Sequence, residues 1–145
     1  MNDALRKLYQ EVIVEHHKSP HNHGPLEGAT HAATAHNPLC GDQVTLRLIV
    51  GDDQLTTVRF ESRGCVLSRA AASLMTDAVQ GKSAAAALEL GRELEAFVGS
   101  PPAAGAADRL GDLAVLEGVR EFPSRIGCVT LPWQALARAL AVTAT

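Results

Sequence analysis

Two stretches of alternating apolar residues, 44–50 and 55–62, are joined by the turn residues Gly51-Asp52-Asp53. Alternation with a period of two predicts strands with one buried face, and the glycine–aspartate turn predicts an antiparallel hairpin. Residues 30–35 are expected to add a third strand at the edge. This pattern constrains the fold most, because it requires a small three-stranded antiparallel sheet with one face against a core.

Apolar residues at helical spacing occur on both sides of this predicted sheet. The predicted helices cover residues 3–17, 68–80, 83–98, 112–117 (a short helical turn) and 131–142. Ser68 is expected to cap the second helix, and Pro132 to lie in the first turn of the last one. The sequence therefore predicts an α+β fold with an N-terminal helix, the small sheet and a helical C-terminal half.

Length and composition indicate a single globular domain over residues 1–145. Hydrophobic residues make up 46% and charged residues 20% of the chain, and the net charge of −3 argues against a nucleic-acid partner. No signal-peptide pattern and no run of about 18 apolar residues is present, so we expect a cytoplasmic protein that does not bind membranes. The segment around 99–109 is expected to be a mobile surface excursion.

Each of the three cysteines, Cys40, Cys65 and Cys128, is adjacent to a glycine and is predicted to lie in a loop. An odd number of cysteines in the cytosol favours ligands or reactive thiols over a disulfide framework. Cys65 and Cys128 are expected just ahead of helices, where N–H groups and the helix dipole favour the thiolate. A free cysteine usually packs as a small hydrophobe, but these three lie off the apolar stripes.

Asp42 is two residues from Cys40, so both side chains can point to the same side of an extended segment. Cys40, Asp42, Cys65 and Cys128 together supply three thiolates and a carboxylate. This set suits a tetrahedral zinc or one edge of an iron–sulfur cluster. A hard carboxylate among thiolates is a displaceable ligand, whereas structural zinc sites usually use only cysteine and histidine.

Histidines are concentrated in the first quarter of the chain, at His16, His17, His21, His23, His31 and His36. Their spacing matches no metal-ligand template, so solvated loop histidines are expected. His36 is the exception that needs a test as a metal ligand, because it lies four residues before Cys40.

The cysteines lie in the motifs Asn37-Pro38-Leu39-Cys40-Gly41-Asp42, Gly64-Cys65-Val66-Leu67-Ser68-Arg69-Ala70-Ala71-Ala72-Ser73 and Arg125-Ile126-Gly127-Cys128. Together these motifs resemble the signature blocks of the U-type iron–sulfur assembly proteins, the NifU N-terminal/IscU/SufU family. Residues 9–20, 81–83 and 131–133 also fit, so the resemblance covers nearly the whole chain. The long segment between Cys65 and Cys128, and the absence of a histidine before Cys128, resemble the SufU branch in particular.

The resemblance implies an IscU/NifU-N-like fold and a role in iron–sulfur cluster assembly by the SUF system. For the SufU branch it implies a zinc-bound sulfur acceptor that takes persulfide sulfur onto Cys40 from a SufS-type cysteine desulfurase. Such a protein is sulfurtransferase-like and acts with the desulfurase rather than as a stand-alone enzyme. Asp42, Cys65 and Cys128 would keep the metal during this exchange.

Two alternatives stay open at this point. The wider family implies a scaffold on which a labile [2Fe–2S] cluster is built on Cys40, Cys65 and Cys128 and passed to recipient proteins. A purely structural zinc module for protein interactions is the other, and Asp42 argues against it.

Arg125 is the last candidate site residue, because it could pair with Asp42 when that carboxylate is released. An equally weighted alternative is that Arg125 is an ordinary solvated surface residue with no role at the site. Gly127 stands where SufU-like proteins more often carry lysine. This chain therefore has no charged side chain directly before Cys128, and no role is expected for one.

Overall fold

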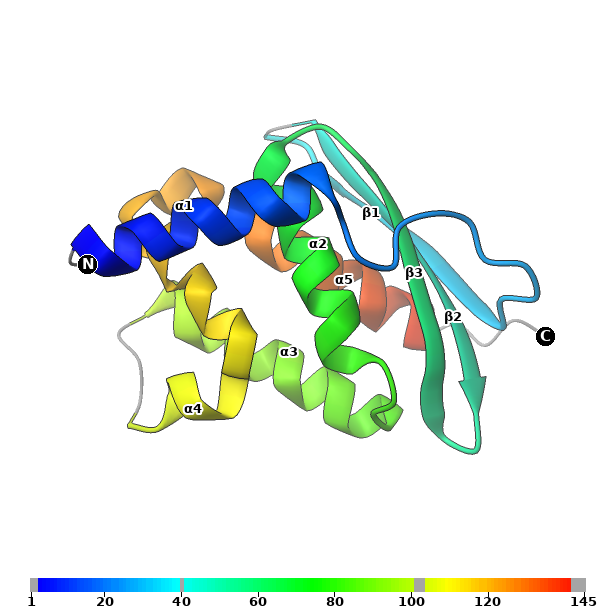
Figure 1. Cartoon of the computed structure of the whole chain (residues 1–145). Coiled ribbons are helices and arrows are strands. Elements are labelled where there is room, and N and C mark those ends of the chain that lie inside the picture. Colours follow the sequence, from blue (N-terminus) through cyan, green and yellow to red (C-terminus); the bar gives the residue numbers. More distant parts are fainter. Residues whose placement is uncertain (1–2, 40, 101–103, 142–145) are drawn as a thin grey trace.

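The computed structural model of the chain describes residues 3–39, 41–100 and 104–141. Its elements in chain order are α1 (Asp3–Lys18), β1 (His31–Asn37), β2 (Asp42–Gly51), β3 (Gln54–Arg63), α2 (Val66–Val79), α3 (Ala84–Gly99), α4 (Ala106–Leu110), η1 (Gly111–Glu121), η2 (Pro123–Arg125) and α5 (Ile126–Ala141). Figure 1 shows the sheet on one side of the molecule and the helices on the other. The predicted α+β fold is confirmed.

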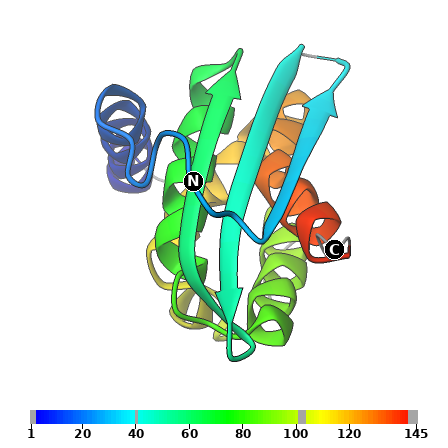
Figure 2. The same cartoon turned by 90° about the vertical axis from the view of Figure 1, so that its right-hand side faces the viewer.

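The sheet is antiparallel with strand order β1-β2-β3, and the predicted edge strand is confirmed as β1. Val44, Leu46 and Leu48 of β2 are fully buried, as their alternation predicts. Figure 2 shows the helices behind the sheet, while the segment between α1 and β1 crosses its outer face. The sheet therefore has one face on the core and one face without helices.

Two helices cover the inner face: α5 packs on β1 and β2, and α2 packs on β3. A second layer follows, in which α1 contacts α2 and η1, and α3 contacts α5. The buried apolar residues of these layers form one cluster. Within the described ranges, no helix is long and apolar enough to cross a bilayer.

The start of α2 differs from the prediction, because Cys65 is the N-cap and Ser68 lies inside the helix. The Leu67 N–H donates to Cys65 Sγ at 3.2 Å, which is the capping interaction expected of an N-cap side chain. Ser68 is buried and its hydroxyl donates to the Cys65 carbonyl at 3.1 Å. Cysteine is not among the residues that usually cap helices, so the sequence pattern favoured the hydroxyl of Ser68, and that prediction was wrong.

The last helix begins at Ile126, five residues before the predicted start, so Cys128 lies in its first turn and not in a loop. Cys128, Val129 and Leu131 are buried and extend the apolar stripe of α5 toward its N-terminus. Pro132 is therefore inside the helix, where it supplies no N–H to the carbonyl four residues earlier. Burial of this stripe outweighs the lost backbone hydrogen bond.

Two other expectations need correction. Of the excursion predicted over 99–109, residues 101–103 lie outside the described residues, and 106–110 form α4 with Ala106 and Leu110 buried. These two residues are four apart, so one helical face meets the core. Leu8, expected on the core-facing stripe of the first helix, is 48% exposed, while Ile13 is buried.

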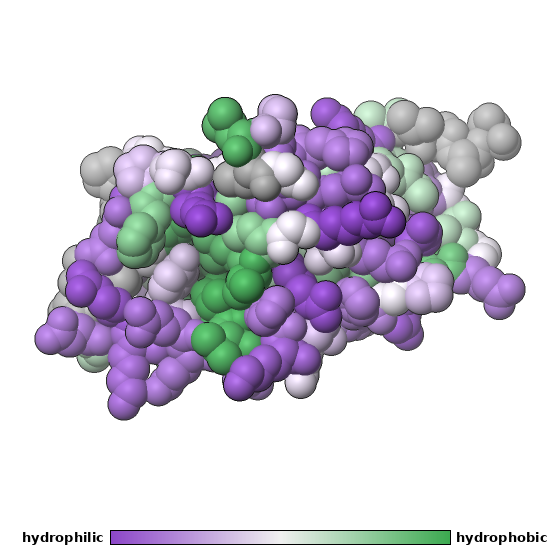
Figure 3. Space-filling model, turned by 90° about the horizontal axis from the view of Figure 1, so that it is seen from above, coloured by the Kyte–Doolittle hydropathy of each residue, from purple (hydrophilic) through white to green (hydrophobic). Residues whose placement is uncertain are grey.

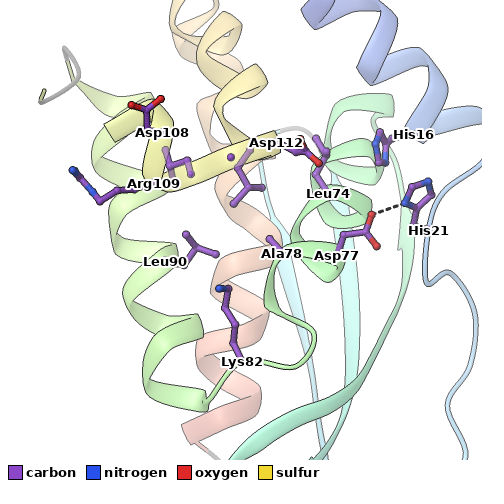
Figure 4. Close-up of a pocket in the computed structure, with 13 residues that line it drawn as sticks. His16, His21, Leu74, Asp77, Ala78, Lys82, Leu90, Asp108, Arg109 and Asp112 are labelled. Carbon is purple, nitrogen blue, oxygen red and sulfur yellow. Dashed lines mark hydrogen bonds and ion pairs between the residues drawn. The ribbon is translucent and has the colours of Figure 1, made fainter. Parts of the chain in front are cut away.

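His16 is buried at the junction of α1 and α2, which contradicts the expectation of a solvated loop histidine. Ser73 Oγ accepts the His21 N–H at 2.8 Å and lies 2.7 Å from His16 Nδ1. Since the Ser73 hydroxyl has one proton, it can donate it to Nδ1 of a neutral His16. Figure 4 shows His16 and His21 at one side of a cavity of about 300 Å³, with His21 paired to Asp77.

The N-terminal half of α1 packs on η1 through Tyr9 and Gly118. A Cβ atom at Gly118 would lie 2.7 Å from Cδ2 and Cγ of the Tyr9 ring. Arg6 also pairs with Glu121 at 3.1 Å across the same contact. Glycine at 118 therefore sets how closely α1 approaches η1.

We expect Gly118→Ala to lower the free energy of unfolding by about 1–3 kcal/mol, because the Tyr9 ring must shift. Thermal unfolding followed by circular dichroism measures the change. Gly99→Ala is the matched control, since a Cβ there meets no heavy atom within 4 Å. Equal melting temperatures for both variants would contradict a steric role of the Tyr9–Gly118 contact.

Burial, and then the neighbouring His21, lowers the pKa of His16 from its ordinary value of 6.5. A lowered pKa stabilises the fold above the unfolded-state value, and this contribution is lost as the pH falls through the folded-state pKa. Melting of metal-free protein should therefore occur at lower temperature near pH 5.5 than near pH 7.5, by about 2–5 °C more in wild type than in His16→Gln. An identical pH dependence in His16→Gln would show that other groups cause it.

Candidate metal centre

Asp42, Cys65 and Cys128 converge at the end of the sheet where β2 begins and β3 ends. One ligand atom of each lies within 4.8 Å of the other two. Asp42 and Cys128 are buried and Cys65 is half-buried. Tetrahedral zinc–thiolate bonds of about 2.3 Å would separate neighbouring ligand atoms by about 3.7 Å, so this spacing fits one metal ion.

The Asp42 carboxylate is 1% exposed, and its two oxygens have different surroundings. Oδ1 accepts the Cys65 N–H at 2.8 Å. Oδ2 is buried and has no hydrogen-bond partner among the residues that the structure describes. An unpaired buried carboxylate oxygen is costly, so this atom is the strongest structural indication that the site binds a cation.

Gly64 allows the backbone to approach Asp42 closely. Its φ is +108°, and a Cβ there would lie 2.5 Å from Asp42 Oδ1. Gly41, the glycine beside Cys40, has no such role, because a Cβ there would meet no heavy atom within 4 Å. Gly41 instead supplies a φ of +70° for the turn into β2.

Two donors reach Cys65 Sγ: the Leu67 N–H at 3.2 Å and Arg125 Nη1 at 3.4 Å. The first donor belongs to the N-terminus of α2 and the second is a guanidinium. Arg125 is exposed and comes from η2, directly before α5. The structure therefore brings Arg125 to the site through Cys65, and its pairing with a released Asp42 stays a prediction.

Tyr9 also lies near the cysteines, a neighbour that sequence reasoning did not identify. Its burial raises the pKa of the phenol, and negative charge on Cys65 and Cys128 adds to the rise while Arg125 opposes it. In the sequence, Tyr9 is an aromatic residue on an amphipathic helix, and an ordinary core residue has the same pattern. The pattern therefore could not identify Tyr9 as a neighbour of the cysteines. The position of α1 on η1 therefore bears on the metal centre.

Cys40 lies outside the described residues, but the chain on both sides of it is described. Asn37 Oδ1 accepts the Leu39 N–H at 3.1 Å, and the Asn37 carbonyl accepts the Gly41 N–H at 2.8 Å. A Cβ at Gly127 would lie 3.0 Å from Asn37 Nδ2. Asn37 thus fixes the described residues on both sides of Cys40, Leu39 and Gly41, and packs against the residue before Cys128.

His36 is exposed, as predicted, and its Nε2 lies 3.2 Å from Gln43 Oε1 on the neighbouring strand. It is not in the group of potential ligands found among the described residues. His36 is close to Cys40 in sequence, but it lies in β1 and its ring faces the neighbouring strand β2.

Exposed apolar side chains occur next to the candidate ligands in sequence. Leu39, Val66 and Phe122 are 89%, 44% and 51% exposed, and each lies within three residues of Cys40, Cys65 or Arg125. Figure 3 views the molecule from above this end and shows hydrophobic residues gathered in the middle of the face, with hydrophilic residues around them. Apolar surface around a reactive site is typical of protein interaction surfaces.

Comparison with known proteins gives relatives along the whole chain. The Streptococcus pyogenes serotype M1 iron–sulfur cluster assembly scaffold protein IscU is 40% identical, over 94% of this chain and 84% of the relative. The zinc-dependent sulfurtransferase SufU of Bacillus subtilis is 37% identical, over 97% and 94% of the two chains.

A solved structure of similar architecture is the putative iron–sulfur cluster assembly scaffold protein for the SUF system from Fervidobacterium islandicum. It superposes with a TM-score of 0.83 at 32% identity, over 92% of this chain and 97% of that one. The family model described as the NifU-like N terminal domain matches residues 8–129. The chain therefore belongs to the NifU-like N-terminal domain family of U-type iron–sulfur cluster assembly proteins.

Proposed function

We propose that this protein is a zinc-bound sulfur acceptor that takes persulfide sulfur from a cysteine desulfurase during iron–sulfur cluster assembly. The observation that carries the proposal is the buried Asp42 carboxylate: one of its oxygens lies within 4.8 Å of both thiols, and its Oδ2 has no hydrogen-bond partner among the described residues. A carboxylate in this position suits a metal site that must open, because it is the most easily displaced ligand of the set. The relative named as a zinc-dependent sulfurtransferase supports this choice.

The residues that would hold zinc are Cys40, Asp42, Cys65 and Cys128. The donor chemistry fits, since three sulfurs and a carboxylate oxygen complete a tetrahedral zinc site. When bound, zinc keeps the thiolates deprotonated at neutral pH. The Leu67 N–H and Arg125 Nη1 both contact the Cys65 sulfur.

Cys40 is the proposed acceptor, because the resemblance to the SufU branch implies this role and its neighbours Leu39 and Gly41 are both exposed. Its thiolate attacks the outer sulfur of the desulfurase persulfide. A new sulfur–sulfur bond forms to Cys40, the bond within the donor persulfide breaks, and the desulfurase cysteine leaves as a thiolate. Cys65 and Cys128 would keep the metal during the exchange, as would Asp42; if the Asp42 carboxylate were released instead, Arg125 could pair with it.

Assembly of a labile [2Fe–2S] cluster, as substrate and cargo, is the second candidate function. The two neighbouring thiols of Cys65 and Cys128 favour it, as does the similarity to a relative named as a scaffold. A structural zinc module is disfavoured by Asp42, since a fourth cysteine or histidine would bind zinc better.

We also propose a single domain over 1–145, supported by the single cluster of buried apolar residues.

Protein purified in air should contain about one zinc per chain. Cys65→Ser and Cys128→Ser should lose most of it, and Asp42→Ala should lose less, because thiolates are the softer ligands for zinc. Metal analysis by mass spectrometry measures the content, with His36→Ala as the control that keeps wild-type zinc. Loss of zinc from His36→Ala with retention in Asp42→Ala would make His36 the fourth ligand.

With a cysteine desulfurase, cysteine and a reductant, the protein should raise sulfide release at least about threefold by offering an acceptor thiolate. Cys40→Ser should abolish the gain, and intact-mass analysis should find one added sulfur atom on Cys40 of the wild type. Sulfur on Cys65 or Cys128 in the Cys40→Ser variant would move the acceptor role to that residue. Unchanged desulfurase turnover, with a [2Fe–2S] absorption spectrum after anaerobic reconstitution, would favour the scaffold.

A further inference from the structure

A polar cleft of about 420 Å³ lies beside the metal centre, on the sheet face that carries no helix. Its lining residues are His23, Gln43, Thr45, Arg47, Glu61, Ser62, Arg63 and Arg69. Gln43 directly follows Asp42, and Arg63 and Arg69 lie two residues before and four residues after Cys65. The cleft and the candidate ligands therefore belong to the same short segments of chain.

The floor of the cleft is the outer face of β2 and β3, where Gln43 lies opposite Arg63 and Thr45 opposite Glu61. One border is the segment that contains His23, which pairs with the free edge of β3: the Gly24 N–H donates to the Phe60 carbonyl at 2.9 Å. The helices are on the far side of the sheet, so this surface is open to a partner (Figure 2). Arg69 reaches it from α2, beyond the edge of β3.

Positive charge in the cleft exceeds negative charge. The Arg47 guanidinium is paired with the Glu61 carboxylate. Arg63 and Arg69 have no ion pair within the described ranges, and Arg69 Nε is shielded from solvent without a hydrogen-bond partner there. Two unpaired guanidinium groups in a chain with a net charge of −3 indicate a local site for an anion.

We propose that this cleft binds an acidic segment of the partner protein that exchanges sulfur at the adjacent thiol site. Guanidinium groups recognise carboxylates through paired hydrogen bonds, and Thr45, Ser62 and Gln43 add further donors. The identity of that partner as a sulfur donor rests on the proposed function, whereas the acidic character of its docking segment rests on the cleft alone. Charge complementarity here would orient the partner with its reactive group toward Cys40.

The lining favours a protein segment over a small anionic metabolite. All eight lining residues are polar or charged, whereas small-molecule sites are mostly walled by apolar and aromatic side chains. The three arginines come from β2, β3 and α2, so their charges are distributed around an open surface. A chain with several carboxylates can reach all three, which a single phosphate cannot do as easily.

Fluorescence anisotropy with a labelled peptide of about six glutamates tests this on the full-length, metal-loaded protein, at about 50 mM salt where screening is weak. We expect saturable binding, and at least about tenfold weaker binding by the double variant Arg63→Gln/Arg69→Gln. Arg59→Gln is the matched control, because it removes one charge from the same strand but does not line the cleft. A glutamine peptide of equal length should not bind.

Two outcomes would overturn the proposal: equal losses in Arg59→Gln and the double variant, or no saturable binding by wild type. Pyrophosphate that displaces the peptide, and itself binds tightly in an Arg63- and Arg69-dependent way, would instead make this a small-anion site. Melting temperature and zinc content report whether the variants stay folded. Cys40→Ser should keep wild-type peptide affinity while losing sulfur acceptance, so a failure of the proposed function and a failure of this inference give different results.

Discussion

The metal centre depends on one buried hydrogen bond, from the Cys65 N–H to Asp42 Oδ1 at 2.8 Å. It joins the first residue of β2 to the residue that caps α2, so it ties the sheet to the main helix of the core. The bond forms only because Gly64 has no side chain, since a Cβ would collide with the same oxygen. With Oδ1 used in this way, Oδ2 is the buried oxygen that has no hydrogen-bond partner among the described residues and is available to a cation.

The third ligand position depends on packing rather than on this hydrogen bond. Cys128 is in the first turn of α5, and α5 is held against the second helical layer where Trp133 meets Gly91. A Cβ at Gly91 would lie 2.9 Å from Trp133 Cε3, so the distance between α3 and α5 is fixed closely. The Cys128 thiol is thus placed by a helix that the core holds in position.

Sequence alone predicted the strands and the fold, because alternation of buried and exposed residues leaves few other arrangements for residues 44–62. It did not predict the start of α5 or the cap of α2, since both depend on tertiary burial and on a thiol acting as acceptor. Burial of His16 and the closeness of Gly64 to Asp42 involve residues far apart in sequence. Local patterns contain no information on such contacts, and the arginine cleft was missed for the same reason.

Charge balance connects the metal centre with the surface around it. Three thiolates and a carboxylate around one zinc leave about two excess negative charges, which low solvent exposure makes costly. Arg125 contacts Cys65 directly, and Arg63 and Arg69 lie within four residues of it along the chain. Arg125 therefore offsets negative charge at the thiol, whereas Arg63 and Arg69 line the adjacent sheet face and make it positive. If the cleft binds an acidic segment of the partner, as we propose, a surface separate from the ligand set would hold the partner, so docking and sulfur exchange would use neighbouring surfaces.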